Sequence, residues 1–130
     1  MMSVTRMSSQ APIVVVTQKL APSDLARLVG HPFKDMVKFV VDVDRGIAAV
    51  GGELHADAKA VLLGHGSEPD VLWGGNYFPG RGEMDCIVFS SMINVRPAAG
   101  NRALEVQDPA LRQRMRDVVF TLIGRGERLS

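Results

Sequence analysis

The clearest structural pattern in the sequence is Val37-Lys38-Phe39-Val40-Val41-Asp42-Val43-Asp44-Arg45-Gly46-Ile47-Ala48-Ala49-Val50. Its first half alternates apolar residues with Lys38, Asp42 and Asp44, which predicts a strand with one apolar face and one largely polar face. Asp44-Arg45-Gly46 predicts a tight turn, because glycine adopts the positive φ that hairpin loops require. The apolar run that follows predicts the partner strand, so this stretch is expected to form a β-hairpin.

Shorter patterns on either side predict the remaining elements. The β-branched run at 13–16 predicts a strand within 12–19, and a short helix is expected after Pro22. Strong helix formers at 56–64 predict a second helix that ends at Gly64 in a left-handed conformation. Residues 67–73 are expected to form one helical turn. Two further strands are then expected, at 76–79 and 84–90, joined by a glycine-rich loop.

The final helix has the clearest boundaries. Asp108 is a suitable N-cap, Pro109 fits the first turn, and Gly124 follows the last apolar position. One apolar stripe runs along the helix. Its members are Leu111, Met115, Val118, Val119, Leu122 and Ile123. This stripe is expected to cover the apolar face of the strand at 37–43.

The strands pair mainly as hairpins, with no run of parallel crossover units. The expected fold is therefore α+β, with a single antiparallel or mixed sheet of about five strands and two to three helices packed mainly on one face. Residues 11–130 are expected to form this single domain, and the polar residues 1–10 a flexible N-terminal leader.

Composition narrows the class of protein. With 130 residues, 46% of them hydrophobic and 22% charged, the chain is typical of one globular domain. A net charge of +1 disfavours nucleic acid as a partner, and no apolar run approaches the roughly 20 residues that span a bilayer, so no membrane partner is expected. Cys86, the only cysteine, favours a reducing, cytoplasmic location and a buried structural role over a reactive one.

The segment 92–102, here called the Asn/Arg loop, is the first candidate site, because Pro97 and Gly100 interrupt regular structure within it. Four side chains rich in N–H donors suit an anionic small molecule with a phosphate or carboxylate group. These predicted ligand-binding residues are Asn94, Arg96, Asn101 and Arg102. Alternatively, they satisfy backbone groups of their own loop and act as a structural brace. The sequence leaves both interpretations open.

The second candidate is Gly51-Gly52-Glu53-Leu54-His55-Ala56-Asp57, in which Glu53, His55 and Asp57 alternate. In an extended chain they would point to one side, and an imidazole beside a carboxylate can act as a general base. His55 and Glu53 are therefore the candidate catalytic residues, for a hydrolysis in which His55 activates water and the arginines stabilise negative charge. If a helix begins at Ala56, Asp57 instead favours its N terminus and His55 is a hinge residue.

No metal site or cofactor is predicted, because the histidines at 31, 55 and 65 lie in unrelated contexts without ligand spacing. The segment 51–57, with Ser91-Met92-Ile93-Asn94-Val95-Arg96-Pro97 and Gly100-Asn101-Arg102, resembles a family of small uncharacterised bacterial proteins. The likeness runs from about Val37 through the final helix; it implies one cytoplasmic domain and transfers no activity or site residue. Two function classes remain: a domain that binds an anionic small molecule, enzymatic or not, and a non-enzymatic structural or protein-interaction module that forms a homodimer.

Overall fold

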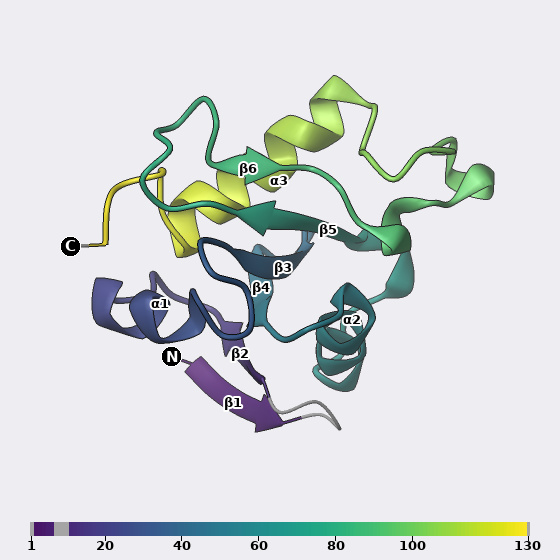
Figure 1. The fold of residues 1–130 in the computed structure, drawn as a ribbon. Coiled ribbons are helices and arrows are strands. Elements are labelled where there is room, and N and C mark those ends of the chain that lie inside the picture. The colour runs from purple at the N-terminus through teal and green to yellow at the C-terminus, as the bar shows by residue number, and fades with distance from the viewer. Residues whose placement is uncertain (1, 7–10, 130) are drawn as a thin grey trace.

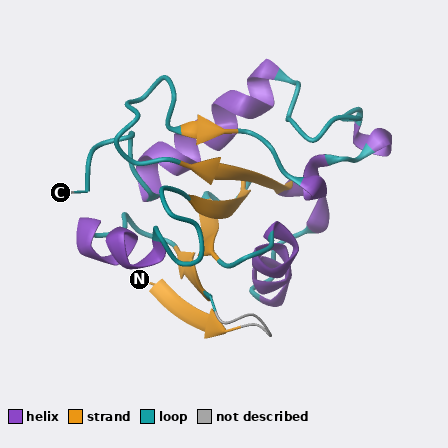
Figure 2. Cartoon of the chain, viewed as in Figure 1, coloured by secondary structure: helices purple, strands orange, loops and turns teal. Residues whose placement is uncertain are grey.

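The computed structural model describes residues 2–6 and 11–129, and it shows an α+β fold built on one antiparallel sheet of six strands (Figure 1). The order β1-β2-β4-β3-β5-β6 runs from the bottom of Figure 1 to the top. The strands are β1 (Met2–Arg6), β2 (Pro12–Val16), β3 (Val37–Asp42), β4 (Ile47–Gly51), β5 (Leu72–Tyr77) and β6 (Ile87–Val88). The helices are α1 (Pro22–Leu28), α2 (His55–Gly64) and α3 (Pro109–Leu122), and the single 3-10 turns are η1 (Pro69–Val71), η2 (Met92–Asn94) and η3 (Pro97–Ala99) (Figure 2). The predicted fold class is confirmed.

The central hairpin of β3 and β4 is held at its turn by a buried carboxylate. Gly46 has a φ of 68°, as the turn requires, and Asp42 Oδ1 accepts hydrogen bonds from the backbone N–H groups of Asp44 and Arg45 at 3.0 and 2.8 Å. The Ser67 hydroxyl donates to Asp42 Oδ2 at 2.7 Å. Asp42 is fully buried, so the prediction of a largely polar second face on this strand is wrong there.

The sheet has a hydrophobic core on each face. On one face, β3 residues such as Phe39 and Val41 pack with α1 and with the apolar stripe of α3, as predicted. On the other face, Val40 packs with Leu62 and the rest of the buried side of α2. Two of the three helices therefore share one face, and α2 alone covers the opposite face, where it buries β3 positions that a single-sided sheet would leave in water.

Several boundaries differ from those predicted. Strand β5 begins at Leu72, so residues expected in a helical turn and a loop lie in the sheet. The positive φ after α2 is at Gly66 (90°), two residues beyond the predicted cap, Gly64. Residues 2–6, expected in a flexible leader, form β1 and pair with β2, which suits the β-branched residues in Met-Ser-Val-Thr-Arg. The rest of the predicted leader, residues 1 and 7–10, lies outside the described residues.

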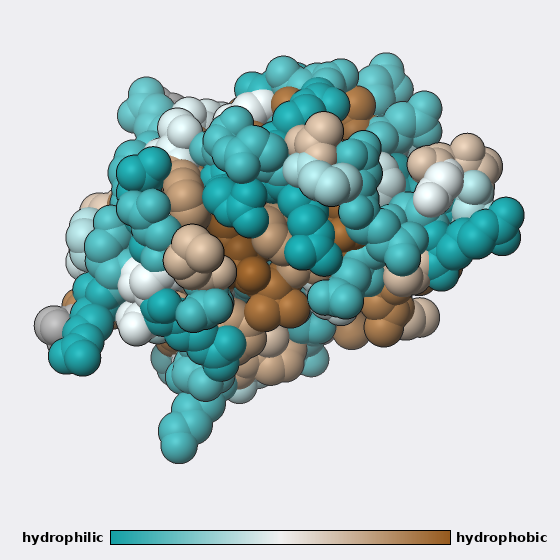
Figure 3. All heavy atoms as spheres, turned by 90° about the horizontal axis from the view of Figure 1, so that it is seen from above, coloured by the Kyte–Doolittle hydropathy of each residue, from teal (hydrophilic) through white to brown (hydrophobic). Residues whose placement is uncertain are grey.

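Helix α3 begins where its cap predicts, because the Asp108 side chain accepts a hydrogen bond from the Ala110 backbone N–H at 3.0 Å. The face seen from above is mostly hydrophilic, with apolar residues exposed near the middle of the view (Figure 3). None of the helices in the described part of the chain has the length and apolar character needed to cross a membrane.

Candidate functional site

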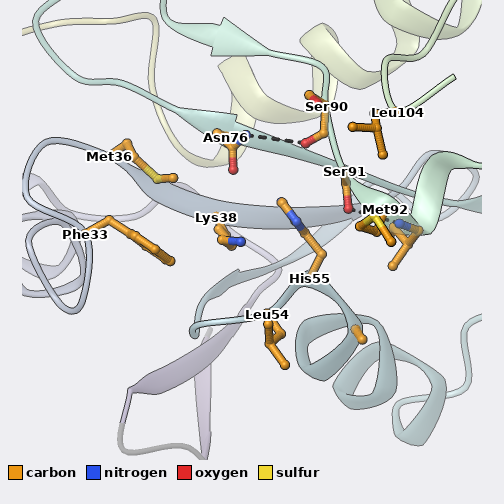
Figure 4. Close-up of a pocket in the computed structure, with 12 residues that line it drawn as sticks. Phe33, Met36, Lys38, Leu54, His55, Asn76, Ser90, Ser91, Met92 and Leu104 are labelled. Atoms are coloured by element: carbon orange, nitrogen blue, oxygen red, sulfur yellow. Dashed lines mark hydrogen bonds between the residues drawn. The ribbon is translucent and has the colours of Figure 1, made fainter.

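A cavity of about 400 Å³ opens beside the N terminus of α2 (Figure 4). Its walls come from the segment before β3, from β3 and β5, from the start of α2, and from the chain after β6. The lining residues are Phe33, Met36, Lys38, Leu54, His55, Ala56, Asn76, Ser90, Ser91, Met92, Ile93 and Leu104. Apolar side chains come from the segment before β3, from the start of α2 and from the chain after β6, whereas β3 and β5 contribute the polar residues Lys38 and Asn76. The arrangement is typical of a small-molecule pocket.

The floor of the cavity contains a cross-strand pair, Lys38 and Asn76, which are directly opposite each other in β3 and β5. Lys38 Nζ lies 5.0 Å from the centre of the Phe33 ring, and burial lowers the pKa of this lysine. No carboxylate among the described residues forms an ion pair with it. Asn76 Nδ2 donates to the Ser90 carbonyl at 3.3 Å, whereas Asn76 Oδ1 is buried and has no hydrogen-bond partner in the described part of the chain.

His55 is the first residue of α2 and is only 8% exposed. Its Nε2 lies 2.7 Å from the Gly75 carbonyl oxygen. A carbonyl can only accept, so Nε2 carries the hydrogen and Nδ1 is the free acceptor. Burial lowers the pKa of His55 to about 4, against the opposing effect of the bond to Gly75; the nearby Lys38 charge also lowers the pKa, and the Asn76 side chain, which favours the protonated ring, raises it. The ring is therefore neutral at pH 7.

A glycine pair in β5 allows these groups to approach. A Cβ atom added at Gly74 would lie 2.9 Å from Ser91 Cβ and 3.1 Å from His55 Cδ2, and one added at Gly75 would lie 2.5 Å from Phe39 Cζ. Cβ contacts under 3.0 Å are essentially never seen, so a larger residue at either position would force its neighbours to move. Sequence reasoning missed Lys38 and Asn76 as site residues, although the glycine pair next to Asn76 was a signal of close packing.

Asn94, predicted to bind a ligand, is fully buried and completes the edge of the sheet. Its Oδ1 accepts from the Gly74 backbone N–H at 2.9 Å, and its Nδ2 donates to the Gly74 carbonyl at 2.9 Å and to the Leu104 carbonyl at 3.1 Å. Strand β6 pairs with β5 only at Asn76 and Tyr77. The carboxamide therefore takes the place of a missing strand at Gly74.

Arg96 continues the same edge. Its guanidinium donates to the Leu72 carbonyl and, at 3.0 Å, to the Pro69 carbonyl. The guanidinium also stacks on the Trp73 ring, 3.8 Å from the ring centre. Arg96 Nε is buried and has no partner among the described residues. Most of this side chain is thus engaged by β5 and the turn that precedes it.

Asn101 and Arg102 differ in their surroundings. Asn101 is buried, donates to the carbonyls of Asn94, Ala103 and Glu105 at 2.8, 3.0 and 3.1 Å, and accepts from the Gln107 backbone N–H at 3.0 Å. Arg102 is exposed, and no hydrogen bond or ion pair of its side chain with another described residue is present. The Asn/Arg loop therefore presents one unengaged guanidinium to solvent.

The predicted alternation of residues 53–57 does not persist in the fold. Helix α2 starts at His55, so Glu53 lies before the helix and Asp57 in its first turn, where an acidic residue favours the helix N terminus. Glu53 is exposed and is not part of the cavity lining. Within residues 2–6 and 11–129, no three His, Cys, Asp or Glu side chains lie close enough to hold a metal ion.

The fold and the cavity define a small α+β domain with a partly apolar pocket at one end of a helix. The family model described as a protein of unknown function, DUF5674, matches residues 14–122, and the chain belongs to this family. The matched range contains every residue of the cavity lining and the whole Asn/Arg loop. The predicted resemblance to an uncharacterised family is confirmed. No curated protein and no solved structure matched the chain.

Proposed function

We propose that the cavity beside α2 binds a small molecule that combines an anionic group with an apolar body. The observation that carries this proposal is Lys38, a partly buried cation on the cavity floor without an ion-pair partner in the described part of the chain. A partly buried cation without an ion-pair partner has lost some of its hydration, and an anionic ligand would compensate that loss.

The start of α2 adds to the attraction for an anion. The N-cap residue, Leu54, has no side-chain oxygen, and its position makes no side-chain capping hydrogen bond. Backbone N–H groups of the first turn carry partial positive charge, and a helix N terminus commonly receives an anionic group. Together with Lys38 on the cavity floor, these groups favour a negative ligand.

Apolar residues at the rim suit the remainder of the ligand. Leu54, Met92 and Leu104 line the cavity and are 58%, 78% and 47% exposed. Phe33 and Met36 form the opposite wall. Exposed apolar groups that surround a polar floor favour a ligand with an aliphatic or aromatic part, because its binding would remove apolar surface from water.

In this proposal His55 is a hydrogen-bonding residue. An imidazole with a pKa of about 4 is a weak general base at neutral pH, and its Nε2 hydrogen is engaged by Gly75. Its Nδ1 remains as an acceptor for a ligand hydroxyl or amide. Catalysis by His55 and Glu53, and hydrolysis in particular, stays a prediction, which incubation of the protein with carboxylic and phosphoric esters would test.

For the Asn/Arg loop we propose a division of roles. The contacts of Asn94, Arg96 and Asn101 with backbone groups support the brace interpretation for these three residues. Arg102 is exposed, and its guanidinium is the group of the loop that can bind an anion. The loop and the cavity are thus two alternative locations for one ligand chemistry, and single substitutions at Lys38 and Arg102 distinguish them.

The test is calorimetric titration and thermal shift of the wild type, Lys38→Met and Arg102→Ala with 4-methylpentanoate, phenylacetate and inorganic phosphate. An apolar carboxylate is expected to bind and stabilise the wild type and Arg102→Ala, and to lose at least about tenfold in affinity with Lys38→Met. Binding that is lost in Arg102→Ala and kept in Lys38→Met would move the site to the Asn/Arg loop. The absence of binding by every anion would refute the proposal.

The exposed rim also favours a second candidate, a homodimer that buries Leu54, Met92 and Leu104 between two copies. Light scattering of the wild type and of Met92→Lys would test it. A dimer that dissociates with this substitution would support the interaction module, and a monomeric wild type would refute it.

A further inference from the structure

We infer that the ligand of this cavity is a 2-hydroxy acid with an apolar side chain, a carboxylate whose neighbouring carbon carries a neutral hydroxyl donor. The inference rests on the proposed function, because it names the ligand class of the same cavity. Three observations on the described residues support it: Lys38 has no anionic partner, Asn76 Oδ1 has no hydrogen-bond donor, and the cavity lining contains no acidic residue.

The side-chain oxygen of Asn76 is an acceptor that a ligand donor could pair. Its Nδ2 already donates to the Ser90 carbonyl at 3.3 Å, which orients the carboxamide and directs Oδ1 toward the side where Lys38 and His55 lie (Figure 4). Oδ1 is buried without a partner among the described residues. A buried acceptor left unpaired is unfavourable, so a ligand O–H or N–H at this point gains a hydrogen bond that the free protein does not make.

The donor and the anion must be close together on the ligand. Lys38 and Asn76 are directly paired in β3 and β5, and their side chains rise from the same face of the sheet. A single ligand that serves both residues therefore carries its donor near its charge. A hydroxyl on the carbon next to a carboxylate satisfies this condition.

The charges of the lining residues favour a hydroxyl over an ammonium group on the carbon next to the ligand carboxylate. The cavity is lined by Lys38 and by the neutral ring of His55, with no Asp or Glu among its lining residues. An α-amino acid would bring a second cation beside Lys38 with nothing to neutralise it, whereas a hydroxyl is neutral. A single lysine and no arginine also suit a carboxylate of one negative charge better than a phosphate, which is commonly held by arginine forks.

The experiment is a calorimetric titration of the wild type with 2-hydroxy-4-methylpentanoate, 4-methylpentanoate and leucine, which share one apolar side chain. The hydroxy acid is expected to bind roughly 5- to 10-fold more tightly than the acid without the hydroxyl, as one hydrogen bond to a buried acceptor allows. Leucine is expected to bind more weakly than the hydroxy acid. In Asn76→Leu the ratio between the two acids is expected to fall to about one, provided that its amide spectrum shows a folded domain.

The outcomes separate this inference from the proposed function. Equal binding of the two acids to the wild type would overturn the hydroxyl assignment and leave an anion-binding cavity. Leucine binding more tightly than the hydroxy acid would overturn the argument from charge. If neither acid binds, the 2-hydroxy acid assignment is overturned, and the proposed function fails as well only if phenylacetate and phosphate also do not bind. The three ligands decide these points on the wild type alone, even if Asn76→Leu does not fold.

Discussion

Replacement of Asn94 by alanine tests the strand-like role of its carboxamide directly. The substitution removes three hydrogen bonds and leaves the Gly74 N–H and the Gly74 carbonyl without their side-chain partner, whereas the Leu104 carbonyl keeps its bond from the Ser91 N–H. Gly74 is buried, and each buried polar group left unpaired costs about 1–3 kcal/mol. Because the groups are adjacent and relax together, we expect Asn94→Ala to lower the free energy of unfolding by about 3–5 kcal/mol in total.

The assay is urea unfolding followed by circular dichroism, with Arg102→Ala as the matched control from the same loop. Arg102 is exposed, so its removal is expected to change the free energy of unfolding by no more than about 0.5 kcal/mol. A loss below about 1 kcal/mol in Asn94→Ala would refute the reasoning. It would show that the carboxamide is free to serve a ligand and that Gly74 finds other partners.

Three further predictions concern stability. Burial lowers the pKa of His55 to about 4, so the neutral ring contributes about 3 kcal/mol to the free energy of unfolding above pH 6.5, and this contribution is lost as the pH falls toward 4. The difference in unfolding free energy between the wild type and His55→Gln should therefore decrease from pH 6.5 to pH 4. A difference that stays constant over this range would contradict the prediction. Gly75→Ala should destabilise the fold by about 1–3 kcal/mol, because the new Cβ meets Phe39. Gly64→Ala should stabilise it by about 0.5–1 kcal/mol, because a Cβ at this helical position has no neighbour within 4 Å. Equal thermal shifts for the two variants would refute the steric argument. Arg96→Lys should lower the melting temperature through loss of ring stacking and of the guanidinium fork, and an unchanged melting temperature would count against both contacts.

The parts of the fold that could be predicted from sequence are those specified by near neighbours. The alternation from Val37 onward, the glycine of the β3–β4 turn, and the Asp108 cap with the stripe behind it all act within a few residues, and each occurs where its pattern indicates. The start of β5 differs from the sequence prediction, which places 72–73 in a helical turn and leaves the two glycines at 74–75 outside a strand. Their reason is a contact with Phe39 and with Ser91, residues distant in the chain.

The site was harder to predict for the same reason. The sequence shows that the Asn/Arg loop is rich in donors but does not reveal their targets, and Asn94 meets Gly74 across 20 residues. The alternating pattern predicts that Lys38 faces solvent, because the sequence does not show that a cavity lies above that end of the strand. Burial and pairing across strands, which determine the chemistry of Lys38 and Asn76, are properties of the folded sheet.

The side-chain closure of the β5 edge has a consequence for hydrogen exchange. The Gly74 amide is protected by Asn94, a side chain on the same segment that contributes Ser91, Met92 and Ile93 to the cavity wall. This amide can exchange with solvent only when that segment opens, and a molecule seated in the cavity would oppose the opening. Its exchange rate is therefore a built-in reporter of occupancy, readable without any label and without knowledge of the ligand.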